Sequence, residues 1–232
     1  TGKTPCILMI AELLLKEGKK PAIISRGYKS GLEKKGGVVS DGKSILVSQK
    51  EAGDEPYMMA LRLPTVPVLV GKDRKVSAKK AVALGADVHY GRTTPILETA
   101  HSPSKIVPYE TWRKRIHEGE LPAVSGKKAF LVSGIGNPAS FAETASEAGL
   151  VRTGDMSFPD HHAYTDEDVR KAIKEAERSG ADLIAVTEKD AVKLMNLESV
   201  RNSKMPFYVL EIEMTIKGHQ EEILEEQWEE LL

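Results

Sequence analysis

The sequence contains almost no cysteine and few aromatic residues. Cys6 is the single cysteine among 232 residues, and phenylalanine, tryptophan and tyrosine together make up 5% of the chain. One cysteine cannot form an internal disulfide, which excludes the class of small secreted domains that disulfides stabilise. Because Cys6 lies in an apolar run, we expect it to be a small buried hydrophobic residue, and a reducing compartment fits this composition.

An excess of charge of either sign is also absent. The sequence has 33 lysines and arginines against 34 aspartates and glutamates, which gives a formal net charge of -1. This balance excludes a strongly basic nucleic-acid-binding protein, so any affinity for phosphate must be local. With 41% hydrophobic and 29% charged residues, the composition is typical of a globular protein.

Long hydrophobic runs are missing as well. The main apolar stretch near the start, residues 6–15, includes Glu12 and is flanked by lysines. It is shorter than the roughly 20 residues that a membrane-spanning helix needs. We therefore expect no part of this sequence to cross a membrane.

The sequence does contain a repeated alternation of helical and extended patterns. An apolar-periodic stretch at 5–16 precedes a β-rich segment, and helical patterns at 54–63 and 73–84 alternate with further Val- and Ile-rich runs. Asp41-Gly42 separates two short runs and predicts a hairpin. Strands separated by helices of this length imply a mostly parallel sheet with right-handed crossovers, so the expected fold class is α/β.

A second α/β unit is expected after an irregular stretch. Residues 90–126 lose the alternation and contain four prolines, and the pattern restarts at Ala129. We therefore predict a nucleotide-binding domain over 1–104, a linker over 105–126 and a smaller α/β domain over 127–232.

The triplet Gly2-Lys3-Thr4, followed at once by an amphipathic helix, matches the last part of a P-loop. In such a loop, backbone N–H groups cradle phosphate, the lysine reaches the β- and γ-phosphate oxygens and the hydroxyl binds Mg²⁺. Thr1 to Thr4 are therefore candidates for binding nucleotide, and Thr4 for binding metal. On three residues alone, a chain end with an ordinary exposed lysine is the simpler interpretation. A P-loop also needs a preceding strand and glycine, so we expect residues before Thr1 to be missing from this sequence.

Two arginines follow predicted strands. Arg26 comes directly after the strand that ends at Ser25, and Arg74 follows the strand 66–70. The carboxyl ends of parallel strands form the ligand-binding edge of a sheet, where a guanidinium can bind phosphate through two hydrogen bonds. A surface ion pair is an equally good interpretation of either arginine.

Five short motifs in order resemble one enzyme family. They are Ser25-Arg-Gly-Tyr28, Glu51-Ala-Gly-Asp-Glu-Pro56, Lys72-Asp-Arg74, Phe158-Pro-Asp-His-His-Ala-Tyr164 and Thr187-Glu-Lys-Asp190. In this order and spacing they resemble tetraacyldisaccharide 4'-kinase, the lipid A 4'-kinase of Gram-negative bacteria, over most of the chain. The resemblance implies a P-loop NTPase-like kinase domain that uses ATP and Mg²⁺. The family's acceptor is the 4'-hydroxyl of a tetraacylated glucosamine disaccharide 1-phosphate.

The resemblance also implies a location and partners. Members act as peripheral proteins at the cytoplasmic face of the bacterial inner membrane, on ATP and a lipid A disaccharide precursor, and no nucleic-acid partner is expected. A P-loop nucleotide switch or assembly ATPase without a lipid acceptor is the alternative function.

The family pattern changes the interpretation of Asp54 and His161. Local sequence favours Asp54 as a helix N-cap before Glu55, whereas the family's catalytic aspartate matches this position. Glu55 then becomes a metal-associated carboxylate. His161 matches the family's histidine and is expected to form a dyad with Asp54; a solvated loop cluster or a transition-metal site are the alternatives. The expected catalytic set is Asp54, His161, Lys3 and Arg74.

The remaining motif residues receive weaker assignments. Arg26 and Tyr28 are expected to line the nucleotide site, and Tyr164 is a further candidate for lining it, although core packing is the alternative for both tyrosines. Lys189 and Asp190 follow a strand end and are assigned a structural role.

The sequence departs from the family pattern at one place. Family members carry an Asp-Asp-Gly-Phe-Gln-His segment after the strand that corresponds to residues 86–88, whereas here Val88 continues into His89-Tyr90-Gly91. Either the protein lacks this acidic motif, or a stretch near 88–91 is missing from this sequence. We favour the second interpretation because the P-loop also lacks its beginning.

Overall fold

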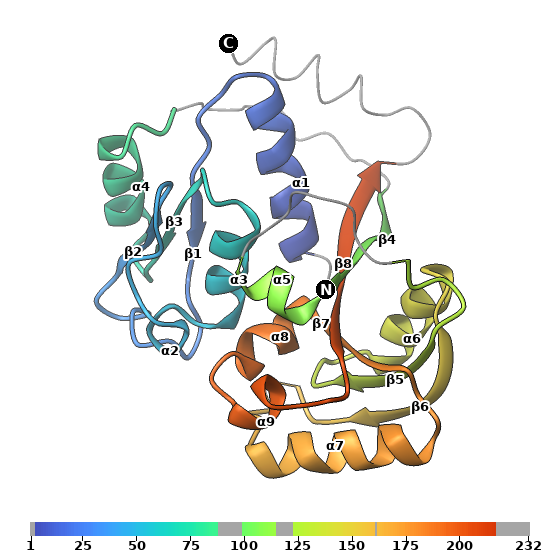
Figure 1. The fold of residues 1–232 in the computed structure, drawn as a ribbon. Helices are drawn as coiled ribbons and strands as arrows, with labels where there is room; N and C mark the ends of the chain where they lie inside the picture. Colours follow the sequence, from blue (N-terminus) through green and yellow to red (C-terminus); the bar gives the residue numbers. More distant parts are fainter. Residues whose placement is uncertain (1–2, 88–98, 115–122, 161, 217–232) are drawn as a thin grey trace. The chain divides into compact units, whose positions relative to one another are not determined.

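The computed structural model describes residues 3–87, 99–114, 123–160 and 162–216 (Figure 1). The chain divides into two compact units, each considered by itself below. Unit 1 contains residues 1–102 together with 213–232, and unit 2 contains residues 103–212. Unit 2 is therefore one continuous stretch of chain, and unit 1 is made of two stretches.

Unit 1 is built on a three-stranded sheet with the order β1-β3-β2. β1 (Ile23–Ser25) is parallel to β3 (Pro67–Val70), and β2 (Gly37–Asp41) is antiparallel to β3. After β2 the chain turns at Gly42, and Ser40 forms an antiparallel bridge with Ile45, so the hairpin predicted at Asp41-Gly42 is confirmed.

In the described residues of unit 1, four helices accompany this sheet. They are α1 (Lys3–Lys16), α2 (Gln49–Ala52), α3 (Asp54–Arg62) and α4 (Arg74–Ala83). The core between helices and sheet consists of small and branched side chains, and Val39, Val68 and Val70 have no exposed area. Cys6, expected to be buried, is partly exposed on α1.

The larger sheet has five strands in the order β4-β8-β7-β5-β6. β5 (Lys128–Ser133) is parallel to both β6 (Val151–Ser157) and β7 (Leu183–Thr187), and β7 is parallel to β8 (Phe207–Ile216). β4 (Thr99–Pro108) forms the edge beside β8. The predicted α/β class with a mostly parallel sheet is thus confirmed, with the five-stranded sheet in the later part of the chain.

The helices of unit 2 connect these parallel strands. α6 (Pro138–Glu147) and α7 (Asp166–Arg178) lie on opposite faces of the sheet in Figure 1. The remaining helices are α5 (Tyr109–Arg113), α8 (Glu188–Leu194) and α9 (Glu198–Arg201). The expected loss of regular structure over residues 90–126 is wrong in part, because β4 and α5 lie within that stretch.

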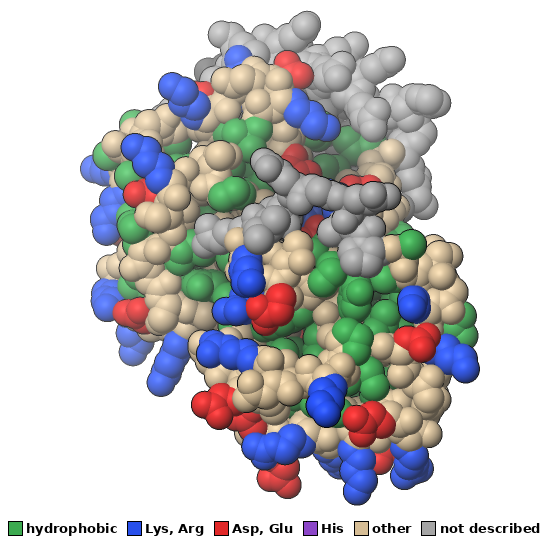
Figure 2. Space-filling view, viewed as in Figure 1, with side chains coloured by type: hydrophobic (Ala, Val, Ile, Leu, Met, Phe, Trp, Pro, Cys, Tyr) green, Lys and Arg blue, Asp and Glu red, His purple; other side chains and the backbone are tan. Residues whose placement is uncertain are grey.

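The surface agrees with the balanced composition. Figure 2 shows lysine and arginine side chains interspersed with acidic ones over the visible face. Within the described part of the chain, no helix is long and apolar enough to cross a membrane.

Candidate functional site

The candidate site in unit 1 lies at the carboxyl edge of its parallel strands. β1 and β3 end side by side, since Ser25 is in register with Val70 and the Gly71 N–H donates to the Ser25 carbonyl at 3.0 Å. The loops that follow these two strands carry Arg26 and Arg74. Ligands of open α/β sheets bind at this edge, so the two arginines occupy the expected place.

Arg26 is held by a carboxylate that the sequence analysis did not single out. Its Nε donates to Glu33 Oε1 at 3.0 Å, and Glu33 Oε2 accepts from the Lys29 backbone N–H at 2.9 Å. The backbone hydrogen bond from Lys29, assisted by Arg26, lowers the pKa of Glu33 below its ordinary value. The ion-pair interpretation of Arg26 therefore holds, and the pair fixes a side chain that is still 57% exposed.

Arg74 points back toward the sheet. It is the first residue of α4, and its Nη1 lies 3.5 Å from the carbonyl oxygen of Ile24 in β1. Asp73 caps this helix by accepting from the backbone N–H groups of Lys75 and Val76. Arg74 is consequently placed at the same strand ends as Arg26.

The loop after β1 depends on a glycine. Gly27 has φ +67°, and a Cβ at this position would collide with Cγ1 of Val70. Two residues later in the same loop, Lys29 also has a positive φ of 59°. Tyr28 between them is 63% exposed, with the Lys29 ammonium 5.2 Å from its ring centroid. Core packing is therefore excluded for Tyr28.

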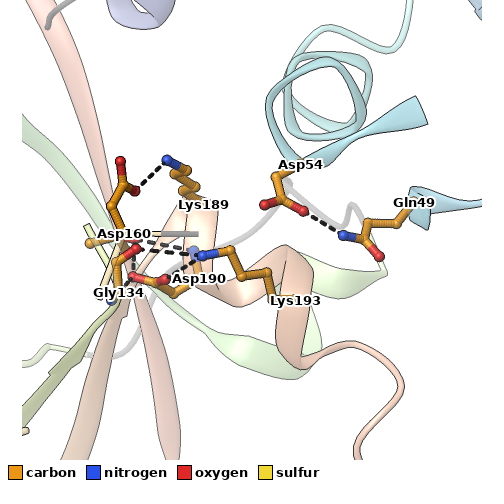
Figure 3. A network of polar contacts seen from close by, with 8 residues as sticks. Gln49, Asp54, Gly134, Asp160, Lys189, Asp190 and Lys193 are labelled. Atoms are coloured by element: carbon orange, nitrogen blue, oxygen red, sulfur yellow. Dashed lines mark hydrogen bonds and ion pairs between the residues drawn. The ribbon is translucent and has the colours of Figure 1, made fainter. Parts of the chain in front are cut away.

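Asp54 is the first residue of α3, but its side chain does not cap the helix. The N-cap is Gly53, with φ +89°, and it makes no side-chain cap bond. Asp54 Oδ1 instead accepts from Gln49 Nε2 at 2.5 Å (Figure 3). The local expectation that Asp54 is an N-cap is therefore wrong, and Gln49, the residue that holds its carboxylate, carried no signal in the sequence.

The start of α3 belongs to the same edge of the sheet as Arg26. Backbone hydrogen bonds join the loop after β1 to α2, with the Leu32 N–H donating to the Glu51 carbonyl at 3.0 Å. Because only Gly53 separates α2 from α3, this contact brings Asp54 to the loop that carries Arg26. Glu55, in the same first turn of α3, is exposed.

The start of α1 supplies the remaining candidates of unit 1. Lys3 is exposed in the first turn and Thr4 is partly buried, while Thr1 and Gly2 lie outside the described residues. α1 packs against α3. Figure 1 shows the amino end of α1 facing the same way as the carboxyl end of β1. The amino end of α1 thus points in the same direction as the strand ends that Arg26 and Arg74 follow.

These residues fit the chemistry of nucleotide and metal. Arg26 and Arg74 at one sheet edge, and Lys3 at the start of α1, carry positive charge of the kind that a polyphosphate attracts. The hydroxyl of Thr4 and the carboxylates of Asp54 and Glu55 are the oxygen ligands that Mg²⁺ prefers. Among the described residues, no group of three or more His, Cys, Asp or Glu side chains is gathered as a metal site.

A second polar cluster lies at the carboxyl edge of the sheet in unit 2. Asp190, in the first turn of α8, has no exposed area and accepts from the Gly134 N–H at 3.1 Å and the Thr187 hydroxyl at 2.7 Å. Lys193 donates to the same carboxylate at 3.2 Å, with its side chain 6% exposed. The structural role predicted for Asp190 fits this network, but the partner Lys193 was missed.

The Tyr164 hydroxyl borders this cluster. Tyr164 is buried, and its oxygen lies beside Gly134 and the Asp190 carboxylate without a hydrogen bond. Burial, followed by the negative charge of Asp190, raises the pKa of Tyr164 well above its ordinary value. Core packing is thus the observed environment of Tyr164 within unit 2.

The loop from Phe158 to Tyr164 follows β6 at this same edge. Asp160 accepts from Lys189 Nζ at 2.9 Å, and His162 pairs with Asp168 at 3.1 Å. His161 lies outside the described residues, so the predicted dyad with Asp54 stays a prediction.

Comparison with known proteins defines the family. The model of the family described as tetraacyldisaccharide-1-P 4'-kinase matches residues 1–89 and 89–229. The chain belongs to this family. The two matches meet at residue 89, where the sequence departs from the 4'-kinase pattern.

Individual 4'-kinases agree with this assignment. The chain is 30% identical to the tetraacyldisaccharide 4'-kinase of Desulfotalea psychrophila, with 97% of this chain and 82% of the relative covered. It is 27% identical to the tetraacyldisaccharide 4'-kinase of Syntrophus aciditrophicus, with 94% of this chain and 77% of that relative covered. Both alignments are longer than the chain itself, so part of each relative has no counterpart here.

A solved structure supports the fold. The chain is similar to the "apo" form of LpxK from Aquifex aeolicus in complex with ATP, with a TM-score of 0.64 and 21% identity over 100% of this chain and 85% of that one. The α/β class with a mostly parallel sheet, expected from the sequence, is thereby supported by a solved structure.

Proposed function

We propose that this protein transfers the γ-phosphate of ATP to the 4'-hydroxyl of tetraacyldisaccharide 1-phosphate, a step of lipid A biosynthesis. The observation that carries the proposal is the family match over nearly the whole chain. The position of Arg26 and Arg74 at the ends of β1 and β3, with Asp54 joined to the same loop through α2, supports it independently. Family membership argues against the alternative of a nucleotide switch without a lipid acceptor.

Each candidate site residue of unit 1 is assigned a role in this reaction. Lys3 and Arg74 neutralise the charge that develops on the transferred phosphoryl group, while Arg26 and Tyr28 line the nucleotide. Asp54 accepts the proton of the 4'-hydroxyl. At the same time the hydroxyl oxygen bonds to the γ-phosphorus, and the bond between the γ-phosphorus and the oxygen that leaves with ADP breaks. Mg²⁺, when bound through residues such as Thr4 and Glu55, supplies further positive charge at the phosphates.

We assign the histidine of the dyad to the loop of unit 2. His161 would orient the Asp54 carboxylate, which requires the nucleotide-binding and His161-bearing parts of the chain to meet during turnover. The boundaries proposed for these parts, 1–104 and 127–232 with a linker between them, follow from the sequence. Peripheral association with the cytoplasmic face of the inner membrane is also part of the proposal, since the acceptor is a membrane lipid.

Phosphoryl transfer tests the proposal directly. ATP labelled at the γ-position, Mg²⁺ and a tetraacylated disaccharide 1-phosphate in detergent micelles should give label in the lipid. The change Lys3→Ala should abolish transfer, because it removes a phosphate-binding charge without disturbing packing. Lys16→Ala, at the other end of α1, is the matched control and should leave transfer unchanged. Release of label only as inorganic phosphate, independent of the lipid, would instead support the nucleotide-switch alternative.

A further inference from the structure

An ion pair joins α8 to the loop between β6 and α7. Lys189 Nζ donates to Asp160 Oδ1 at 2.9 Å, although the two residues are 29 positions apart (Figure 3). The Lys189 side chain is 19% exposed and that of Asp160 44% exposed. Asp160 directly precedes His161 in the sequence. The pair therefore ties Asp160 to the first turn of α8.

The residue on the other side of His161 is attached as well. His162 pairs with Asp168 at 3.1 Å and stacks on Phe158 with ring centroids 4.5 Å apart. Asp168 is itself part of the capping box of α7, in which Thr165 and Asp168 exchange hydrogen bonds. The residues on both sides of His161 are thus attached to different helices, α8 before it and α7 after it.

Lys189 projects from a rigid support. The next residue, Asp190, is fully buried and bonded to Gly134, Thr187 and Lys193. A buried carboxylate with these partners is costly to disturb, because removing a partner leaves a charge without compensation. These hydrogen bonds attach the first turn of α8 to the ends of β5 and β7. Lys189, in the same turn, holds Asp160 through their ion pair.

We propose that Lys189 is a positioning residue for phosphoryl transfer, acting through Asp160 on the loop Phe158–Tyr164. The inference rests on the proposed function, in which this loop carries His161. A partly exposed ion pair contributes little to folding stability, so its value lies in the geometry that it imposes. Small displacements of a catalytic group reduce turnover strongly, which gives Lys189 an effect on kcat without contact with substrate.

The test is a set of variants in the full protein. Lys189→Met should lower kcat roughly 10- to 100-fold, with KM for ATP and the Tm nearly unchanged. Lys189→Arg keeps the charge and should retain most of the activity. Combining Lys189→Met with Asp160→Ala should cost no more than the larger single effect, because each change by itself already removes the Lys189–Asp160 ion pair. Arg178→Met removes a comparable ion pair with Glu175 on α7 and should leave kcat unchanged.

Hydrogen exchange separates this inference from the function on which it rests. Lys189→Met should speed amide exchange in residues 158–164 and leave α7 protected. If the wild type is active and Lys189→Met has a normal kcat, the positioning role is overturned. A loss of kcat in Lys189→Met that is accompanied by a large fall in its Tm would overturn it as well. If the wild type transfers no phosphate to lipid, the proposed function fails. In that case, unchanged exchange in the loop would still overturn the proposal for Lys189.

Discussion

Asp54 illustrates how structure changes the interpretation of a single residue. With Gly53 as the N-cap of α3, replacing Asp54 removes no side-chain cap bond. Asp54→Asn should therefore leave the Tm nearly unchanged while lowering kcat by about 10² to 10⁴, because the amide cannot accept the hydroxyl proton. Steady-state kinetics and thermal unfolding of the same preparation check both expectations. Normal turnover in Asp54→Asn would remove it from the catalytic set.

The proposed partnership with His161 gives a second test at the residue scale. His161→Ala should also lower kcat, and the double variant with Asp54→Asn should lose less than the product of the single effects. Residues that act as one unit behave in this way, whereas fully multiplicative losses would show that the two residues act separately.

Gly27 allows a prediction about stability. Gly27→Ala places a side chain at φ +67° and against Val70, so both backbone strain and steric overlap oppose it. We expect a loss of about 2–4 kcal/mol in the free energy of unfolding. Gly18→Ala is the control, since Gly18 has a similar φ of +72° but open space around it. Urea denaturation should show a smaller loss for Gly18→Ala; equal losses would mean that Val70 moves aside.

Among the elements, α7 has a pH-dependent amino end. Burial raises the pKa of Asp168, but hydrogen bonds from His162 and Thr165 outweigh burial, and the net pKa lies below the ordinary value of 3.8. A carboxyl whose pKa is lower in the folded protein stabilises it above the unfolded pKa, and this contribution is lost as the pH falls through the folded pKa.

Asp168→Asn should expose this dependence. At pH 7 we expect a loss of about 0.5–1 kcal/mol in the free energy of unfolding, because hydrogen bonds to a charged acceptor become bonds to a neutral one. The difference from wild type should shrink as the pH is lowered from 5 through 3. Denaturation curves at several pH values check this, and a difference that stays constant with pH would contradict the role of the charge.

Individual helices and strands show where sequence patterns predict the structure and where they do not. The start of α7 can be read from neighbouring residues alone, because Thr165 and Asp168 form a capping box and a capping box is a local signal. β4 was missed because half of residues 99–108 are polar and two of them, Pro103 and Pro108, are prolines. An edge strand tolerates both features, since one side of its backbone has no ladder to complete. Its pairing with β8, a hundred residues later, leaves no local trace.

The candidate site shows a similar division. Lys3, Arg26 and Arg74 could be assigned from strand ends and a helix start, because parallel sheets place such positions at one edge. Gln49, Glu33 and Lys193 could not, since each becomes important only through a partner that folding brings near. Motif patterns thus indicate the residues proposed to bind a ligand better than the residues that hold those side chains in place.

At the scale of the whole molecule, nucleotide binding should stabilise the two units unequally. The residues proposed to bind ATP belong to unit 1, so a non-hydrolysable ATP analogue at 100 times its Kd should stabilise that unit by about 2.7 kcal/mol. Hydrogen exchange should then slow in β1, β3 and α3, with little change in β5 and β7. Protection confined to β5 and β7 would place the nucleotide in unit 2 and contradict the assignment.

The interrupted course of unit 1 has a consequence for the order of events during synthesis. Residues 103–212 form unit 2 without a break, whereas unit 1 needs residues on both sides of that stretch. On a ribosome, chain segments become available from the amino end onward. All of unit 2 therefore leaves the exit tunnel before the second stretch of unit 1 does. The earlier stretch of unit 1 is therefore joined by its later stretch only after a whole further unit has been synthesised.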